Sequence, residues 1–271
     1  MRETVVKNCD GLLVRVASAL VGIPVFIMAA WWGQWPLFLL VAALYFTGIR
    51  EMLRLAAGTG LKPSFSLAYA GGFVLLAAAY YDSASYPAAL VCFLLICAVA
   101  LVFLFPRYTL PEAGVTFFTT AYLSFFLYLY LLRLLPHGGQ WLLLALVATW
   151  AFDIVAYFGG RFLGKRRLAP VLSPGKTLVG FISGLLGSAV ASSLFSFWLP
   201  FDRVFLFGLG LVVGVAGQVG DLVFSAVKRT TGNKDTGCLI PGHGGVLDRF
   251  DSMLLTAPVV YMAARWLMSV G

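Results

Sequence analysis

The sequence of residues 204–227, VFLFGLGLVVGVAGQVGDLVFSAV, decides the architecture of this chain. The segment is almost wholly apolar, and it is longer than the about 20 residues that a helix needs to cross the hydrocarbon core of a bilayer. Its charged residue is Asp221, near the end that leads into Lys228 and Arg229. We therefore predict a membrane-spanning helix that carries an acid close to one boundary of the membrane.

Similar apolar runs recur along the whole chain. Of the 271 residues, 61% are hydrophobic and 11% are charged, whereas soluble domains carry about 25% charged residues. The excess apolar surface must face lipid. Polar punctuation gives candidate segments near 16–32, 37–49, 67–81, 88–105, 115–135, 141–158, 178–199, 204–227 and 250–268. The sequence thus predicts an all-α fold, a polytopic integral membrane bundle of about nine transmembrane helices in a single membrane domain, 1–271.

The basic residues lie mainly on alternate connections between these segments. The formal net charge is +8, and a positive-inside distribution explains this charge better than nucleic-acid binding does. On this basis the N-terminus and the connections 159–177 and 228–249 are cytoplasmic, and the chain is a multi-pass protein of the inner (cytoplasmic) membrane. Long polar connections on one face indicate that the chemistry takes place there. Lipid headgroups and nucleotide phosphates are the expected partners, and nucleic acid is not.

Three acids are placed to meet at this cytoplasmic boundary. Asp221 is costly inside an apolar helix, by about 2.5–3.5 kcal/mol at mid-helix on insertion scales. Asp248 and Asp251 are three residues apart and project from one face if a helix begins near Val246. They either favour that helix N-terminus electrostatically or bind a hard cation such as Mg²⁺, which takes one or two carboxylates together with phosphate oxygens. The nearby Asp221 favours the metal interpretation.

Cations and glycines accompany these acids. The cations are Lys228, Arg229, Lys234 and Arg249. The positive-inside rule explains each of them singly, but together they are typical of a pocket for anions. Gly244 and Gly245 precede the expected helix start, where backbone N–H groups can approach an anion. His243 beside them is a candidate contact.

Two further features lie upstream. Asp153 is a second acid inside an apolar segment, and it is either a structural partner of a nearby arginine or part of the site. The run SPGKT at 173–177 lacks the first glycine of a phosphate-binding P-loop. Lys176 and the hydroxyl of Ser173 remain candidates for contacts with phosphates.

Residues 225–251 resemble the hallmark of the phosphatidate cytidylyltransferase (CDP-diacylglycerol synthase) family. That hallmark is S-x-apolar-K-R, four residues, K-D and, after a short gap, H-G-G-apolar-x-D-R-apolar-D. The matching residues are Ser225, Lys228, Arg229, Lys234, Asp235, His243, Gly244, Gly245, Asp248, Arg249 and Asp251. A second pattern, W-x-F-D-x-x-A-Y-F-x-G, is matched by Trp150, Phe152, Asp153, Ala156, Tyr157, Phe158 and Gly160. The resemblance covers the chain from about Trp150 onward.

The resemblance implies transfer of the cytidylyl group of CTP to phosphatidic acid, Mg²⁺ as cofactor, Asp221, Asp248 and Asp251 as its ligands, and a homodimer. We expect catalytic roles for Asp221, Asp248, Asp251, Lys228 and His243, and substrate-binding roles for Lys176, Ser173, Arg229, Lys234, Asp235, Gly244, Gly245, Arg249 and Asp153. The segments within about 16–135 are then a scaffold, and 141–271 is the catalytic part.

Some features depart from this family or leave alternatives open. Gly175 and Val179 stand where the family usually has a basic residue and a glutamate. Another CTP-using lipid enzyme, such as a CDP-archaeol synthase or a polyprenol kinase, is compatible with the same residues. A transporter is the alternative from another class, but its acids should be spread across the depth of the bilayer, and these gather at one face.

Overall fold

The computed structural model describes residues 12–237, 239 and 244–270, and they form a helical bundle with one small hairpin. The longer helices are α1 (Leu12–Trp32), α2 (Gln34–Gly58), α3 (Phe65–Tyr81), α4 (Tyr86–Phe103), α5 (Leu110–Leu123), α6 (Leu127–Leu134), α7 (Gly138–Leu163), α8 (Leu178–Ser193), α9 (Arg203–Thr230) and α11 (Met253–Val270). The short elements are η1 (Ser83–Ser85), η2 (Ser124–Phe126), η3 (Leu194–Phe197), α10 (Leu247–Phe250) and the strands β1 (Arg167–Ala169) and β2 (Ser173–Thr177).

Within the described residues, six helical stretches are long and apolar enough to cross a membrane, by length and composition. They are Gln34–Gly58, Ser83–Phe103, Leu110–Leu134, Gly138–Leu163, Leu178–Phe197 and Arg203–Thr230. Phe65–Tyr81 and Met253–Ser269 are shorter apolar helices, and α1 covers the first predicted segment. The prediction of an all-α membrane bundle is confirmed.

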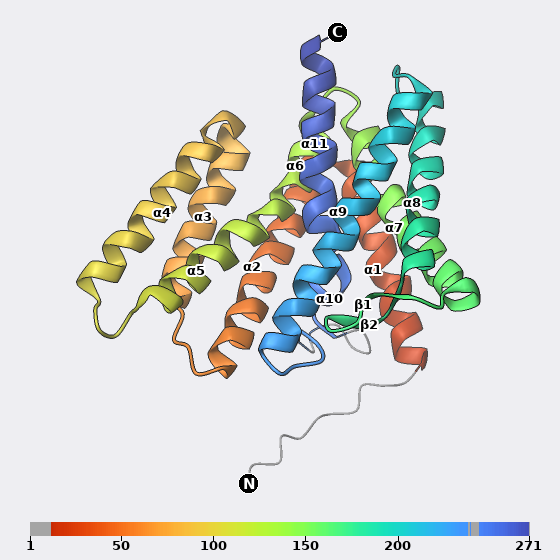
Figure 1. Ribbon diagram of the computed structural model, residues 1–271. Coiled ribbons are helices and arrows are strands. Elements are labelled where there is room, and N and C mark those ends of the chain that lie inside the picture. Colours follow the sequence, from red (N-terminus) through yellow and green to blue (C-terminus); the bar gives the residue numbers. More distant parts are fainter. Residues whose placement is uncertain (1–11, 238, 240–243, 271) are drawn as a thin grey trace.

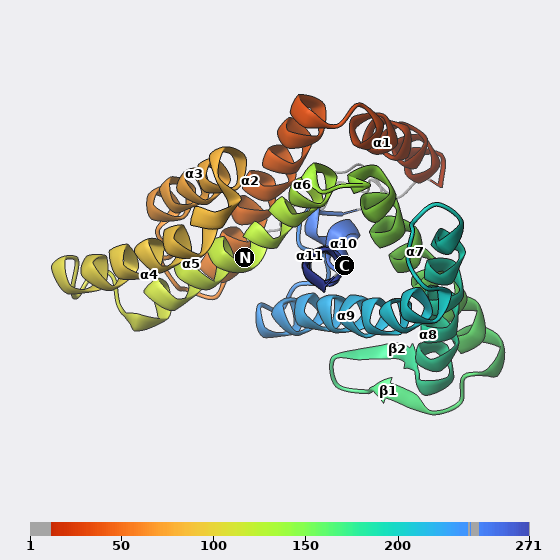
Figure 2. The same ribbon diagram turned by 90° about the horizontal axis from the view of Figure 1, so that it is seen from above.

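The helices form two arms, with α10 and α11 between them (Figure 2). One arm holds α2 to α6, and the other holds α7, α8 and α9, which pack on one another in sequence order. Helix α11 packs against α6, α7 and α9 and so joins the two arms. The hairpin and α10 lie at the same end of the bundle as the start of α1, and the end of α11 lies at the opposite end (Figure 1). The two long polar connections therefore meet at one end of the bundle.

Small residues let α7, α8 and α9 approach closely. A Cβ atom added to Gly184 of α8 would lie 2.9 Å from the Cβ of Ala156 on α7, and one added to Gly210 of α9 would lie 2.5 Å from the Cα of Ala189 on α8. Such contacts are typical of helix packing in lipid, where no hydrophobic effect drives helices together. They hold the three helices around a shared cavity at the end that carries the hairpin.

Two parts of the chain differ from the sequence prediction. The connection 159–177, expected as a polar loop, continues α7 to Leu163 and then forms an antiparallel hairpin, in which Arg167 pairs with Thr177. The segment 37–49 is only the middle of α2, which has 25 residues. The helix continues because Arg50 and Arg54 share an exposed face while Glu51 turns inward and is buried. The charged residues after position 49 therefore did not mark the end of the helix.

Candidate active site

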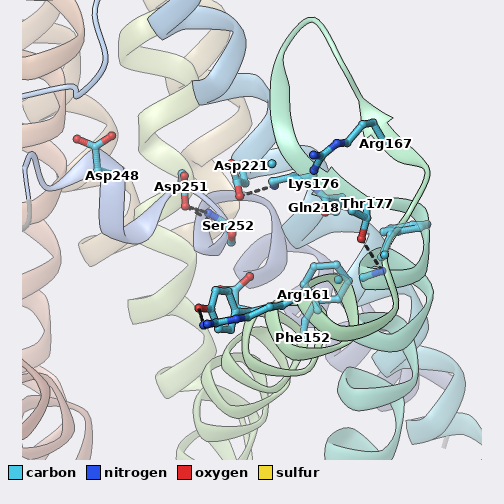
Figure 3. A pocket seen from close by; sticks show the side chains of 18 of the residues that line it. Phe152, Arg161, Arg167, Lys176, Thr177, Gln218, Asp221, Asp248, Asp251 and Ser252 are labelled. Carbon is cyan, nitrogen blue, oxygen red and sulfur yellow. Dashed lines mark hydrogen bonds and ion pairs between the residues drawn. The ribbon is translucent and has the colours of Figure 1, made fainter.

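A cavity of about 690 Å³ opens where α7, β2, α8, α9 and α10 come together (Figure 3). Its charged lining residues are Asp153, Arg161, Arg167, Lys176, Asp221, Asp248, Arg249 and Asp251. Acids and cations that the sequence places in four different segments thus converge on one space. Arg161 and Arg167 were not among the predicted site residues, because the positive-inside rule was enough to explain basic residues on the connection 159–177.

Asp221 forms an ion pair with Lys176, which β2 brings to it from the hairpin (Figure 3). The carboxylate also accepts a hydrogen bond from the Ser225 hydroxyl, one helical turn further along α9, with 3.3 Å between Oγ and Oδ1. The Asp221 side chain remains 33% exposed and that of Lys176 22% exposed. Both groups are therefore accessible from the cavity.

Asp251 reaches the same space from the turn between α10 and α11. Gly220 makes this approach feasible, because a Cβ atom at position 220 would stand 2.6 Å from the carbonyl oxygen of Asp251. One Asp251 oxygen accepts a hydrogen bond from the Ser252 N–H at 2.8 Å. Burial, together with the negative charge of Asp221, raises the pKa of Asp251 to about 7. Two carboxylates that disfavour each other's charge in this way suit a site for a cation.

Asp248 is held differently, because both of its oxygens have protein partners. Lys228 Nζ lies 2.8 Å from Oδ1, and the N–H groups of Thr236 and Gly245 donate to Oδ2 at 2.8 and 3.0 Å. The Thr236 hydroxyl lies 3.0 Å from the same oxygen and 3.1 Å from a Glu51 oxygen, and it shares its one proton between the two carboxylates. Burial acts to raise the pKa of Asp248, but the lysine and the two N–H groups outweigh it and hold the pKa below its usual value. Asp248 therefore organises the loop that precedes α10.

Glu51 is a functional candidate that the sequence interpretation missed. It lies on α2, is 7% exposed, and accepts hydrogen bonds from the N–H groups of Val246 and Leu247 at 2.9 and 3.0 Å and from the Thr236 hydroxyl at 3.1 Å. Gly245 is needed beside it, because a Cβ atom there would stand 2.5 Å from a Glu51 oxygen. The sequence did contain one signal for Glu51: it is an acidic residue among the apolar residues that form the buried face of α2.

The remaining predicted residues fall into three groups. Asp153 and Arg249 line the cavity. Ser173 begins β2, while Arg229 Nε donates to the Leu172 carbonyl at 3.3 Å, next to the hairpin. Lys234 and Asp235 are exposed on the loop after α9. His243 lies outside the described residues.

The glycine prediction has a specific outcome in the structure. Gly244 adopts a φ of 83°, a left-handed conformation that glycine adopts without strain. The anion that the Gly245 N–H meets is the Asp248 carboxylate of the chain itself. A contact of either glycine with a substrate phosphate stays a prediction.

A metal site has to be judged from the donor set. Among the described residues, no group of three His, Cys, Asp or Glu side chains is arranged to hold a metal ion. Mg²⁺ does not require three, since it binds through one or two carboxylates together with substrate phosphates and water. Asp221 and Asp251 meet that requirement, and Asp248 lines the same cavity.

The comparisons with known proteins all point to cytidylyltransferases. The sequence model of the cytidylyltransferase family matches residues 13–267. The chain belongs to that family. The match includes the arm of α2 to α6, where the residue motifs showed no likeness beyond membrane helices.

Three bacterial proteins are similar to this chain over part of its length. Phosphatidate cytidylyltransferase of Staphylococcus haemolyticus is 39% identical over 157 residues, 57% of this chain and 60% of the relative. The Bacillus subtilis protein of the same name is 39% identical over 158 residues, 57% of this chain and 59% of the relative. The Staphylococcus aureus protein is 38% identical over 157 residues, with coverage of 57% and 60%. The aligned part spans about 60% of the length of these relatives.

Proposed function

We propose that this chain transfers the cytidylyl group of CTP to phosphatidic acid, giving CDP-diacylglycerol and pyrophosphate. The observation that carries the proposal is the cavity in which Asp221, paired with Lys176, faces Asp251 and Asp153 at one end of a membrane bundle. Family membership and the names of the bacterial relatives support it. We propose that the cavity lies at the membrane surface, where a lipid headgroup and a nucleotide from solution can meet.

The charges of the cavity suit two polyanionic substrates. Arg161, Arg167 and Lys176 come from the end of α7 and from the hairpin, so they surround the outer part of the cavity. We assign them, with Arg249, to the phosphates of CTP. Cations placed in this way reduce the repulsion between a nucleotide and an anionic lipid. Lys176 would exchange Asp221 for a phosphate oxygen when CTP binds.

Mg²⁺ is the proposed cofactor. Asp221 and Asp251 would hold it, and Asp248, the third acid of the predicted set, would support them from the loop before α10, because both of its oxygens have protein partners. When bound, the ion would withdraw charge from the phosphate oxygens and favour departure of pyrophosphate. Lys228 keeps Asp248 in place, and Ser225 orients Asp221 through its hydrogen bond.

The reaction needs no covalent enzyme intermediate. A phosphate oxygen of phosphatidic acid is already anionic and attacks the α-phosphorus of CTP. A new P–O bond forms as the bond from the α-phosphorus to the bridging oxygen breaks, and pyrophosphate carries away the electron pair. The Ser225 hydroxyl donates to Asp221, but the ion pair with Lys176 makes this carboxylate a weak base, so we assign Ser225 to orienting Asp221 and not to nucleophilic attack. We therefore propose one in-line displacement with both substrates bound.

The setting of the enzyme is also part of the proposal. The chain is a membrane protein, and the concentration of Lys and Arg on the connections at the cavity end supports a cytoplasmic active site in the inner membrane. The homodimer implied by the family resemblance is kept as a proposal.

One assay tests the proposed function against its closest alternatives. Purified protein is given Mg²⁺, CTP labelled in the cytidine and a panel of acceptors that includes phosphatidic acid, an archaeal-type ether lipid phosphate and a polyprenol. We expect labelled CDP-diacylglycerol and an equal amount of pyrophosphate. A polyprenol kinase would release CDP and leave no cytidine on the lipid. Failure to label phosphatidic acid would overturn the proposal.

A further inference from the structure

One residue of the cavity wall has a buried hydrogen-bond donor without a partner. Gln218 is 6% exposed and lines the cavity (Figure 3). Among the described residues, no group accepts a hydrogen bond from its side-chain Nε2. An unsatisfied buried donor costs about 1–3 kcal/mol. That cost is recovered if a bound substrate supplies the acceptor.

The depth of Gln218 indicates which substrate this is. On α9 it precedes Asp221 by three residues, a rise of roughly 4.5 Å away from the hairpin end and toward the middle of the membrane segment. The cations Arg161 and Lys176 lie at the helix end and on the hairpin. Gln218 therefore lies deeper in the bundle than the groups assigned to the nucleotide phosphates.

The cavity that Gln218 lines has an aromatic part, and this part reaches the same stretch of α9, because a Cβ atom at Gly214, one turn before Gln218, would stand 3.0 Å from the Phe152 ring. Phe152, the residue before Asp153 on α7, and Phe181, near the start of α8, both line the cavity, and their ring centroids are 6.2 Å apart in an edge-on arrangement. A phosphate would have to give up its water and its cations to enter such a wall. A neutral amide donor among aromatic rings fits a neutral acceptor on a mostly apolar molecule.

We propose that Gln218 donates a hydrogen bond from Nε2 to an acyl ester carbonyl of the lipid acceptor, and so favours diacyl over ether-linked phosphatidate. This inference rests on the proposed function. When the lipid phosphate lies at the level of Asp221, the glycerol backbone extends inward and presents its ester carbonyls to the deeper wall. An ether-linked lipid has no such carbonyl and leaves the buried donor unpaired.

The test crosses one substitution with two acceptors. Wild type and Gln218→Met, which keeps the length of the side chain and removes the donor, are assayed with diacyl phosphatidate and with the dialkyl analogue of the same glycerol stereochemistry. We expect the ratio of kcat/KM for diacyl to that for dialkyl to fall about three- to tenfold in the variant, the value of one net hydrogen bond. The rate with the dialkyl lipid and the KM for CTP should stay unchanged.

The control is Gln140→Met, because Gln140 lines a separate cavity beside Trp31 and Trp198. It should leave the acceptor ratio as in wild type. An equal loss with both acceptors in Gln218→Met, or a raised KM for CTP, would assign the amide to the nucleotide or to the fold and overturn the inference. A wild type that cytidylylates neither lipid refutes the proposed function itself, whereas a wild type active equally on both lipids refutes only the role of Gln218.

Discussion

Two lysine–aspartate pairs contribute an acid to the cavity wall, and they are built in opposite ways. Lys176 and Asp221 are 22% and 33% exposed, and Asp221 has one further partner, the Ser225 hydroxyl. In the pair of Lys228 with Asp248 the acid is 8% exposed, and its second oxygen accepts three more hydrogen bonds from residues 236 and 245. The first pair can open for a ligand, whereas the second is part of the framework.

The difference separates residues that can act on a ligand from residues that support the fold around the same cavity. Breaking an accessible pair leaves two solvated charges, so the fold loses little. Breaking a buried pair leaves an uncompensated charge and unpaired donors, so the fold loses much. Substitutions in the two pairs should therefore affect different measurements, although both acids line the same cavity.

The largest effect on turnover is expected for Asp221→Asn. We expect kcat/KM to fall on the order of 10²–10³-fold, because the carboxylate is proposed to act on charge that develops in the transition state. The midpoint of thermal unfolding in detergent should stay close to wild type, since an accessible pair contributes about 0–1 kcal/mol. Asp202→Asn is the control, because Asp202 caps the far end of α9 through the Val204 N–H at 3.0 Å and should leave turnover unchanged. Near-normal turnover in Asp221→Asn contradicts the comparison.

Asp248→Asn should show the opposite balance. Its loss leaves Lys228 unpaired and disturbs the loop before α10, so we expect about 3 kcal/mol of lost stability together with reduced activity. Thermal unfolding monitored by circular dichroism measures the first, and the transfer assay measures the second. A variant as stable as wild type would show that Asp248 acts on the substrates or the metal alone.

Sequence reasoning found the membrane helices and most of this cavity because the information was local. The apolar runs defined the spans, and Asp221 was conspicuous as a charge inside one of them. Glu51 was missed because its partners lie 185 to 196 residues away, a pairing that no local pattern contains. Arg167 was explained by topology, and only the hairpin register that places it opposite Thr177 brings it to the cavity.

Glu51→Gln tests whether the scaffold arm sets the framework of the site. The amide keeps one acceptor but turns its NH₂ group toward N–H donors, so we expect about 1–3 kcal/mol of lost stability and a severalfold lower kcat with an unchanged KM for CTP. The matched control is Glu112→Gln on α5, because Glu112 caps its own helix through the Thr109 N–H at 3.0 Å and is not among the residues that line the cavity. If Glu51→Gln and Glu112→Gln have the same kcat, α2 does not position the loop.

The smallest effects are expected when the two lysines themselves are replaced. Lys176→Met should raise the KM for CTP about fivefold, because one accessible cation on the nucleotide is worth about 1 kcal/mol, and stability should be unchanged. Lys228→Met should instead lower stability and leave the KM for CTP near wild type, because its partner Asp248 is buried and would lose its cation. Transfer kinetics at varied CTP and thermal unfolding, both at fixed Mg²⁺, distinguish the two. If both substitutions change the KM for CTP, or both change the stability, the accessible pair and the framework pair form one functional unit. The distinction between a ligand-binding pair and a structural pair is then wrong.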